Sequence, residues 1–381
     1  MQHLPYSKND FGTSPLMFYY ETTLACDLAC KHCRASAQEK PAGDELATEQ
    51  ALQLIEQVAS FPRKPNICFT GGDPLKRNDI FQLIQHAVSQ NLTVALTPSA
   101  TPLATRQAFE QAKDAGVQAL GISLDAPTGA VHDAFRGFDG SFRKTCEMLG
   151  FAQDLKIPVQ INTSITRRNF HLLDAMADFL GSEDFAGTIM MWSVFFLIPV
   201  GRGLEEQRIT PPEYEVAFEK LWHYAKEKPF AVKTTEAPHY RRFVLRLGSN
   251  PLDVPRPFKF AKGDRENPET FSRARHRAPL GVTDGRGIMF VSHRGEIYPA
   301  GFLPITCGQF PKDSVVDVYQ QHPVFKALQN PDNYKGNCRR CEYRFVCGGS
   351  RSRAFALTGD YLESEPDCCY QPGQDPLYAG L

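Results

Sequence analysis

The chain has 381 residues, of which 42% are hydrophobic and 22% are charged, so it can bury a sizeable core. Forty-two Lys and Arg residues against 43 Asp and Glu residues give a net charge of -1, which supplies no field that attracts nucleic acid or anionic lipid. No apolar run reaches the ~20 residues that span a bilayer, and the first residues lack a signal-peptide pattern. We expect a cytoplasmic protein that binds neither nucleic acid nor membrane.

Six short segments rich in β-branched and aromatic residues alternate with helical segments over the first half of the chain. The expected strands begin at Leu16, Asn66, Thr93, Ala119, Val159 and Thr188. Amphipathic helices are expected over 48–60, 79–90, 105–115, 142–154 and 170–180, with Thr48 as the first N-cap. This alternation is typical of a parallel sheet with crossover helices. We predict an α/β fold, a partial (β/α)6 TIM-like barrel, with its chemistry at the carboxyl ends of the strands.

The pattern changes after residue 200. We expect a helix over 212–228, an extended piece over 232–235, a helix over 239–247 and then a Pro-, Arg- and Lys-rich loop to about residue 279. Residues 287–301 predict a hairpin that turns at Arg294-Gly295, and residues 316–328 a short helix. The expected organisation is an N-terminal extension (1–15), the barrel core (16–200), a helical and loop linker (201–280) and a small cysteine-rich domain (281–381).

Eleven cysteines are more than an ordinary cytosolic enzyme needs, and a reducing compartment disfavours structural disulfides. Seven of them have the spacing of metal ligands. They are Cys26, Cys30 and Cys33 in a C-x3-C-x2-C run, and Cys338, Cys341, Cys347 and Cys368 in a C-x2-C-x5-C-x20-C run. The other four, to which we assign no role, are Cys68, Cys146, Cys307 and Cys369.

The first run leaves a metal site open. Three thiolates cannot complete a tetrahedral site, and the only other nearby ligand, His32, is wedged between two of the cysteines. A four-iron four-sulfur cluster on three cysteines keeps one iron free for a substrate or cofactor, whereas structural zinc needs a fourth protein ligand. The residues therefore favour iron.

The order of these motifs resembles the radical SAM superfamily, whose C-x3-C-x2-C loop follows the first strand of a partial barrel. Gly71-Gly72-Asp73-Pro74 follows the second expected strand and resembles that superfamily's Gly-Gly-Glu-Pro motif, with Asp for Glu. In the family this motif binds the amino group of S-adenosylmethionine. The resemblance implies further contacts to this cofactor at later strand ends and at the aromatic position in the cysteine loop, here Thr97, Ser99, Ser123, Asp125, Asn162 and His32.

The resemblance covers residues 16–199 and implies a radical enzyme. In such enzymes the reduced cluster cleaves S-adenosylmethionine, and the resulting 5′-deoxyadenosyl radical removes hydrogen from a substrate. A reducing partner such as flavodoxin or ferredoxin is implied as well.

The second run offers four thiolates, a closed set that suits either zinc or an iron–sulfur cluster. Its spacing resembles the C-terminal SPASM domain of radical SAM maturases. Two positions depart from the two-cluster form of that domain, because Ala300 and Arg351 stand where further cysteines would lie. The resemblance therefore implies one auxiliary [4Fe-4S] cluster, as in the branch that makes heme d1 and heme from siroheme. The cluster could relay an electron or anchor the substrate.

A tetrapyrrole substrate is consistent with arginines that could bind propionates, although the same arginines could belong to a solvated loop. They are Arg241, Arg242, Arg273, Arg275 and Arg277. His239 could bind the substrate iron, but a helix cap or surface position is the more common role. Arg136 could contact cofactor or substrate, or form a salt bridge.

Two other classes of protein remain open. A peptide maturase that crosslinks or epimerises a ribosomal peptide is the alternative enzyme. A non-catalytic zinc or electron-transfer protein would use the same cysteines, but it does not explain Gly71-Gly72-Asp73-Pro74 or the Ser123-Leu124-Asp125 strand end.

Overall fold

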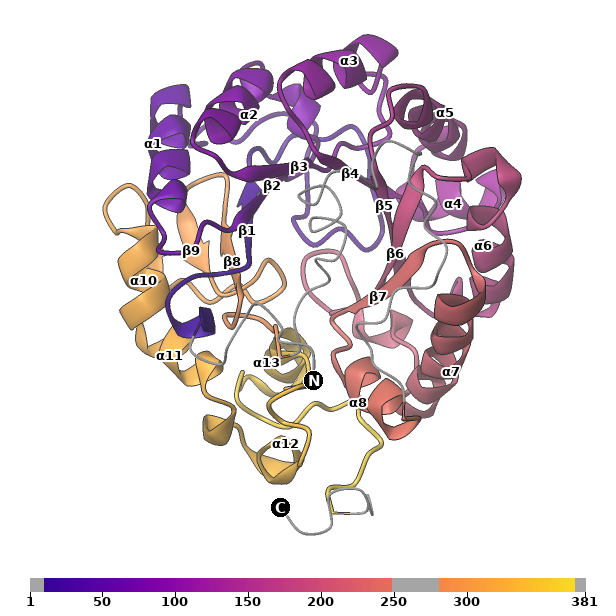
Figure 1. Cartoon of the computed structure of the whole chain (residues 1–381), viewed down its shortest axis with the longest axis vertical. Helices are drawn as coiled ribbons and strands as arrows, with labels where there is room; N and C mark the ends of the chain where they lie inside the picture. Colours follow the sequence, from indigo (N-terminus) through magenta and orange to yellow (C-terminus); the bar gives the residue numbers. More distant parts are fainter. Residues whose placement is uncertain (1–9, 249–280, 374–381) are drawn as a thin grey trace, which may run out of the picture.

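The computed structural model describes residues 10–248 and 281–373, and its strands form one ten-stranded sheet (Figure 1). The strand order is β10-β9-β8-β1-β2-β3-β4-β5-β6-β7, and all neighbours from β8 to β7 are parallel. The strands are β1 (Met17–Glu21), β2 (Asn66–Thr70), β3 (Thr93–Leu96), β4 (Ala119–Ser123), β5 (Val159–Ile165), β6 (Ile189–Phe196), β7 (Ala231–Thr235), β8 (Ile288–Val291), β9 (Glu296–Tyr298) and β10 (Gly308–Gln309).

The helices lie mostly on the outer side of the curved sheet, and the last two lie at its open side (Figure 1). They are α1 (Thr48–Ala59), α2 (Ile80–Ser89), α3 (Arg106–Asp114), α4 (Gly129–Arg136), α5 (Ser141–Asp154), α6 (Leu173–Leu180), α7 (Pro211–Glu227), α8 (His239–Arg246), α10 (Val315–Gln321), α11 (Pro323–Gln329), α12 (Gly336–Arg340) and α13 (Arg351–Thr358). The main hydrophobic core lies between these helices and the outer face of the strands. No helix in the described ranges combines the length and the apolar character that crossing a membrane requires.

All six expected barrel strands are confirmed, but the sheet does not end with them. The extended piece at 231–235 pairs with β6 as β7, and the predicted hairpin places β8 in parallel beside β1. The sheet therefore crosses the expected boundaries at residues 200 and 280. Pairing with β8 satisfies the backbone groups on the β1 edge, which a six-stranded barrel would leave free.

Some helix ends differ from the sequence expectation. Thr48 is the first helical residue of α1 and not its N-cap, which is Ala47. The helix expected over 316–328 is two helices, because Pro323 lacks the N–H that a continuous helix would need. Helix α4 was not expected from the sequence. Arg273, Arg275 and Arg277, which were considered as groups that could bind propionates, lie outside the described residues.

The inner face of the sheet is polar and accessible to solvent. On β5, Val159 and Ile161 are fully buried toward the helices, whereas Gln160, Asn162 and Ser164 between them keep part of their surface exposed. Successive side chains on a strand point to opposite faces, and β1 alternates in the same way around Tyr19. The side chains on the concave face of β5 and β1 thus keep part of their surface accessible.

Candidate functional site

The loop of the first three cysteines begins just after β1. Its start is held by a backbone hydrogen bond from Cys26 to Gln38 at 2.6 Å. The backbone N–H of Leu28 donates to Cys26 Sγ at 3.4 Å, and that of Ala37 donates to Cys33 Sγ at the same distance. Donors aimed at sulfur favour the thiolate form, which is the form that binds metal. Burial nevertheless raises the pKa of the Cys26 thiol to about 11, so a bound metal would have to replace its proton.

Gly71 and Gly72 are needed where the chain passes the cysteine loop. A Cβ at Gly71 would lie 2.5 Å from the carbonyl oxygen of Thr23, and one at Gly72 would lie 2.3 Å from that of Ala25. The Gly72 N–H donates to Thr23 O at 2.8 Å, which fixes the end of β2 against the cysteine loop. The close approach that these glycines permit is thus to the backbone of the protein itself.

Asp73 is a fully buried residue that joins the loops after β2 and β3. Its carboxylate accepts hydrogen bonds from the Leu75 N–H at 3.2 Å, the Ser99 N–H at 3.3 Å and the Thr101 hydroxyl at 2.6 Å. Pro74 follows as the first residue of a short 3-10 helix, Pro74–Lys76. These bonds use both carboxylate oxygens, so Asp73 holds the ends of β2 and β3 together.

The expected polar residues at the strand ends gather on the concave face. Ser99 donates to the Gly72 carbonyl at 2.8 Å, and Cys26 Sγ lies 3.6 Å from its hydroxyl oxygen. Ser123 and Asn162 are paired neighbours on β4 and β5. The Thr97 side chain lies against Gly121. A Cβ on that residue would be 2.7 Å from the Thr97 hydroxyl oxygen, so the glycine leaves the space that Thr97 occupies. The structure thus brings these predicted residues to one side of the sheet.

His32, Asp125 and Arg136 form one buried group beside the cysteine loop. Arg136 Nη2 lies 2.6 Å from Asp125 Oδ2, so the salt-bridge interpretation of Arg136 is the one observed. The His32 ring lies 4.4 Å from that of Phe135, and its Nε2 is 4.0 Å from Asp125. Burial, together with Arg136 and Arg202, holds the pKa of His32 well below its ordinary value. Its imidazole is therefore neutral.

Lys233 is a residue of the concave face that the sequence analysis missed. It lies on β7 beside the hydrogen bond between Ser193 and Thr235 at 3.0 Å, whereas its neighbour Val232 is in the hydrophobic core. Burial, with the nearby Arg241, lowers the pKa of Lys233 from 10.5 to about 8. Within the part of the chain that the structure describes, Lys233 has no ion-pair partner. The alternation of β7 could have revealed it, had that strand been assigned to the barrel.

Arg241, at the start of α8, is a second cation without a carboxylate partner among the described residues. Its guanidinium donates to the carbonyl oxygens of Val282 at 2.8 Å and Val346 at 3.3 Å. Burial and the neighbouring Arg286 lower its pKa to about 10. The neighbouring Arg242, by contrast, pairs with Glu215. Two unneutralised positive charges therefore lie near each other between the barrel and the C-terminal region.

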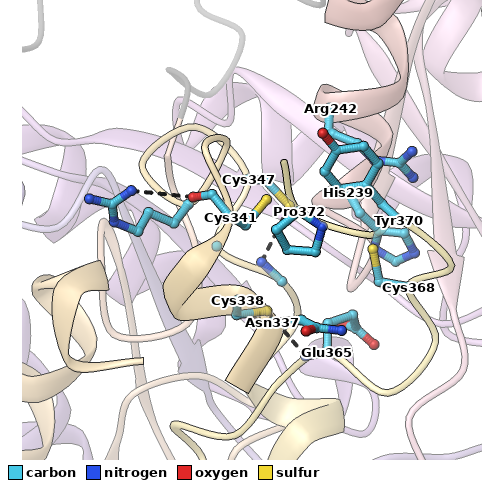
Figure 2. Close-up of a pocket in the computed structure, with 13 residues that line it drawn as sticks. His239, Arg242, Asn337, Cys338, Cys341, Cys347, Glu365, Cys368, Tyr370 and Pro372 are labelled. Atoms are coloured by element: carbon cyan, nitrogen blue, oxygen red, sulfur yellow. Dashed lines mark hydrogen bonds between the residues drawn. The ribbon is translucent and has the colours of Figure 1, made fainter. Parts of the chain in front are cut away.

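The four C-terminal cysteines line one pocket together with His239 and Arg242 (Figure 2). They are Cys338, Cys341, Cys347 and Cys368. Glu365 donates its backbone N–H to Cys338 Sγ at 3.2 Å, and Gly349 donates to Cys347 Sγ at 3.4 Å. Burial raises the pKa of the Cys341 and Cys347 thiols to about 12. A bound metal would have to replace these thiol protons.

Ala300 and Arg351 occupy the two positions where the two-cluster form of the SPASM domain has further cysteines, and both side chains pack within the protein. Arg351 is fully buried, directs Nη2 toward Cys338 Sγ at 3.6 Å and packs over the Tyr334 ring at 4.5 Å. Ala300 packs against Leu303 and Leu328. Neither position offers a metal ligand.

Arg353 ties this pocket to the barrel. It is fully buried, pairs with Glu365 at 3.2 Å and Asp367 at 3.0 Å, and donates to the Phe196 carbonyl at 3.2 Å. It also donates to the Glu236 carbonyl at 2.8 Å. One side chain thus connects the ends of β6 and β7 to the segment that carries Cys368.

Comparisons with known proteins agree with this arrangement. The model of the Radical SAM superfamily matches residues 20–180. An AdoMet-dependent heme synthase from Nitratidesulfovibrio vulgaris is 35% identical over 375 residues, which are 97% of this chain and 96% of the relative. A PqqA peptide cyclase from Rhodopseudomonas palustris is 24% identical over 374 residues, 96% of this chain and 89% of the relative. Streptococcus suis SuiB, solved with S-adenosylmethionine, has a TM-score of 0.67 at 14% identity and covers 94% of this chain and 78% of its own.

Proposed function

Because this chain belongs to the radical SAM superfamily, and within it to the family of the AdoMet-dependent heme synthases, we propose that it converts an iron tetrapyrrole into heme. The observation that carries this substrate is the presence of Lys233 on β7 and Arg241 on α8, two cations near each other that have no carboxylate partners among the described residues. A buried cation is stable when an anion neutralises it. Tetrapyrrole propionates are anions of the required kind.

The first cysteine site fits the cofactor that the family implies. S-adenosylmethionine bound to a four-iron cluster on Cys26, Cys30 and Cys33 supplies a hydrogen-abstracting radical once a donor such as flavodoxin or ferredoxin has reduced the cluster. Among the described residues, no three side chains of His, Cys, Asp or Glu converge on the position of a single ion. Three thiolates without a fourth cysteine suit a four-iron cluster, which keeps one iron free for the cofactor.

The expected cofactor residues divide into those that contact S-adenosylmethionine and those that position the contacts. We assign the amino group of the cofactor to the backbone at Gly71 and Gly72, and its carboxylate and ribose to Thr97, Ser123 and Asn162. The neutral, stacked His32 is suited to pack on adenine. The positioning residues, bonded within the protein, are Asp73, Pro74, Ser99 and Asp125.

The second cysteine site is proposed to hold one auxiliary four-iron cluster. Its four thiols share one pocket and receive N–H donors, as thiolate ligands of a cluster do. The Arg353 network holds this pocket against the ends of β6 and β7, so a cluster there would lie beside the carboxyl ends of these strands.

The substrate chemistry follows from the difference between iron coproporphyrin and heme, because heme carries vinyl groups in place of some propionates. Removing one hydrogen atom from a propionate, and then carbon dioxide and one electron, leaves a vinyl group. A cluster held by Cys338, Cys341, Cys347 and Cys368 would supply an acceptor for that electron. The protein's own part is to hold the remaining carboxylates, for which we assign Lys233 and Arg241.

The test is an anaerobic assay with dithionite and S-adenosylmethionine, with and without Fe-coproporphyrin III or siroheme derivatives. Formation of 5′-deoxyadenosine is followed together with the mass of the tetrapyrrole. We expect one tetrapyrrole to lose mass as carbon dioxide is released, and this loss to fall in a Lys233→Met variant. Cleavage of S-adenosylmethionine that leaves every tetrapyrrole intact would contradict the proposal and favour a peptide substrate.

A further inference from the structure

His239 is a buried imidazole that finds no hydrogen-bond partner in the described structure. Its exposed fraction is 0%, and neither Nδ1 nor Nε2 has a donor or acceptor near it. The ring packs against Tyr214 at 5.2 Å and Phe218 at 4.8 Å between ring centroids. Aromatic side chains therefore pack against the imidazole, while its polar atoms remain without hydrogen bonds. His239 is thus neither a helix cap nor a surface residue.

The same histidine lines the pocket of the four C-terminal cysteines. Figure 2 shows His239 with Arg242 and Tyr370 on the side of the pocket where Cys368 lies. Arg242 is only 3% exposed, and its Nε also has no partner although its Nη2 pairs with Glu215. Two side chains of α8 thus bring unsatisfied N–H groups to one pocket. Buried N–H groups are nearly always paired in folded proteins, so each of these requires an acceptor.

We propose that His239 donates its N–H to a sulfur atom of the auxiliary cluster, with Arg242 Nε as a second donor. This inference rests on the proposed auxiliary cluster, whose sulfides and thiolates would be the acceptors for these N–H groups. Hydrogen bonds to the sulfurs of a cluster help to set its reduction potential. A donor stabilises the reduced form, which carries more negative charge, and therefore raises the potential. The role proposed for His239 is therefore to raise the reduction potential of the cluster and not to coordinate its iron.

The test isolates the second site in the full chain. A Cys26→Ala/Cys30→Ala/Cys33→Ala background removes the first cluster, and reconstitution under anaerobic conditions then loads only the C-terminal cysteines. His239→Phe keeps an aromatic ring between Tyr214 and Phe218 but removes the N–H, whereas His239→Gln keeps an N–H donor. Phe218→Leu disturbs the same packing and leaves the imidazole in place. Iron content and redox titrations followed by electron paramagnetic resonance are the readouts.

We expect all variants to bind the same amount of iron and His239→Phe alone to shift the potential to a more negative value. At a fixed applied potential the ratio of reduced to oxidised cluster should fall about tenfold, which corresponds to ~59 mV for one electron. His239→Gln should stay close to the parent. An unchanged potential in His239→Phe, an equal shift in Phe218→Leu, or loss of iron from His239→Phe would overturn the proposal. A parent that binds zinc or no iron would instead disprove the auxiliary cluster itself.

Discussion

Arg136 and Asp125 form a buried ion pair, with 2.6 Å between Nη2 and Oδ2, at the edge of the cysteine loop. The same guanidinium approaches Cys30 Sγ at 3.9 Å, and Asp125 accepts the Ser164 N–H at 2.8 Å. One pair thus connects the loop that carries the first three cysteines to the carboxyl ends of β4 and β5. The cofactor contacts assigned to these strands depend on this connection.

Replacing Arg136 with Met should destabilise the protein by about 3–5 kcal/mol, because it leaves the fully buried Asp125 carboxylate without its cation. Thermal unfolding of the metal-free protein measures this effect. The matched control is Arg106→Met, which breaks an exposed pair with Asp154 and should cost no more than about 1 kcal/mol. Equal effects of the two substitutions would show that the Arg136 pair is not a structural connection.

The two cysteine sites should load iron independently. Anaerobic reconstitution of the parent should give about eight irons per chain, and either Cys30→Ala or Cys347→Ala should halve this number. Cys30→Ala should also abolish 5′-deoxyadenosine formation, because only the first site binds S-adenosylmethionine. Cys146→Ala, outside both groups, is the control and should retain all the iron. Full 5′-deoxyadenosine production by Cys30→Ala would contradict the assignment of the first site.

Gly72→Ala should disrupt the first site through the backbone. The new Cβ would lie 2.3 Å from the Ala25 carbonyl oxygen, so the cysteine loop or the end of β2 must move. We expect loss of S-adenosylmethionine cleavage and a lower melting temperature. Gly150→Ala is the control. Nothing lies within 4 Å of the Cβ that this substitution adds, and inside a helix such as α5 alanine is about 1 kcal/mol more favourable than glycine. A Gly72→Ala protein with normal cleavage would mean that the loop has room to adapt.

Binding of the carboxylate substrate should weaken above pH 8. The pKa of Lys233 is lowered to about 8 in the free protein, so its positive charge is present below that pH and is lost as the pH rises through it. Arg241 and Cys68, with pKa values of about 10 and about 11, keep their charge states in this range. The dissociation constant of Fe-coproporphyrin III, measured from its absorbance, should rise above pH 8 by up to about tenfold per pH unit.

Two substitutions separate this effect from a general response to pH. Lys233→Arg keeps a charge at all these pH values and should abolish the rise in the dissociation constant. Lys233→Met should bind weakly at every pH. If Lys233→Met showed the same pH profile as the parent, the titrating group would lie elsewhere.

The strands and the cysteine motifs were predictable because their signals are local. Each barrel strand is a short apolar run, and each cysteine group has its own spacing. The membership of β7 and β8 in the barrel was not predictable, because it depends on pairing with β6 and β1, far away in the sequence. Lys233 could not be predicted as a residue of the concave face for the same reason. The side of the sheet on which it lies is defined only by the pairing of β7 with β6.

Burial decided the remaining differences between expectation and structure. His239 follows Pro238 in a polar segment, which is typical of a cap, yet α8 packs against α7 and encloses it. The hydrogen bonds of the Asp73 carboxylate to Leu75, Ser99 and Thr101 could not be read from its motif, which resembles a cofactor-binding turn. These environments come from distant segments and leave no local pattern in the sequence.

The pairing of β8 with β1 also determines how the two halves of the chain can be separated. Tyr20 pairs with Val291, only a few residues before the loop of Cys26 begins. A chain cut before β8 would expose the edge of β1 to other molecules and invite aggregation, so the barrel is poorly suited to expression as a separate module. Because one hydrogen-bonded sheet includes strands from both regions, strand pairing joins them directly, in addition to the chain that connects them.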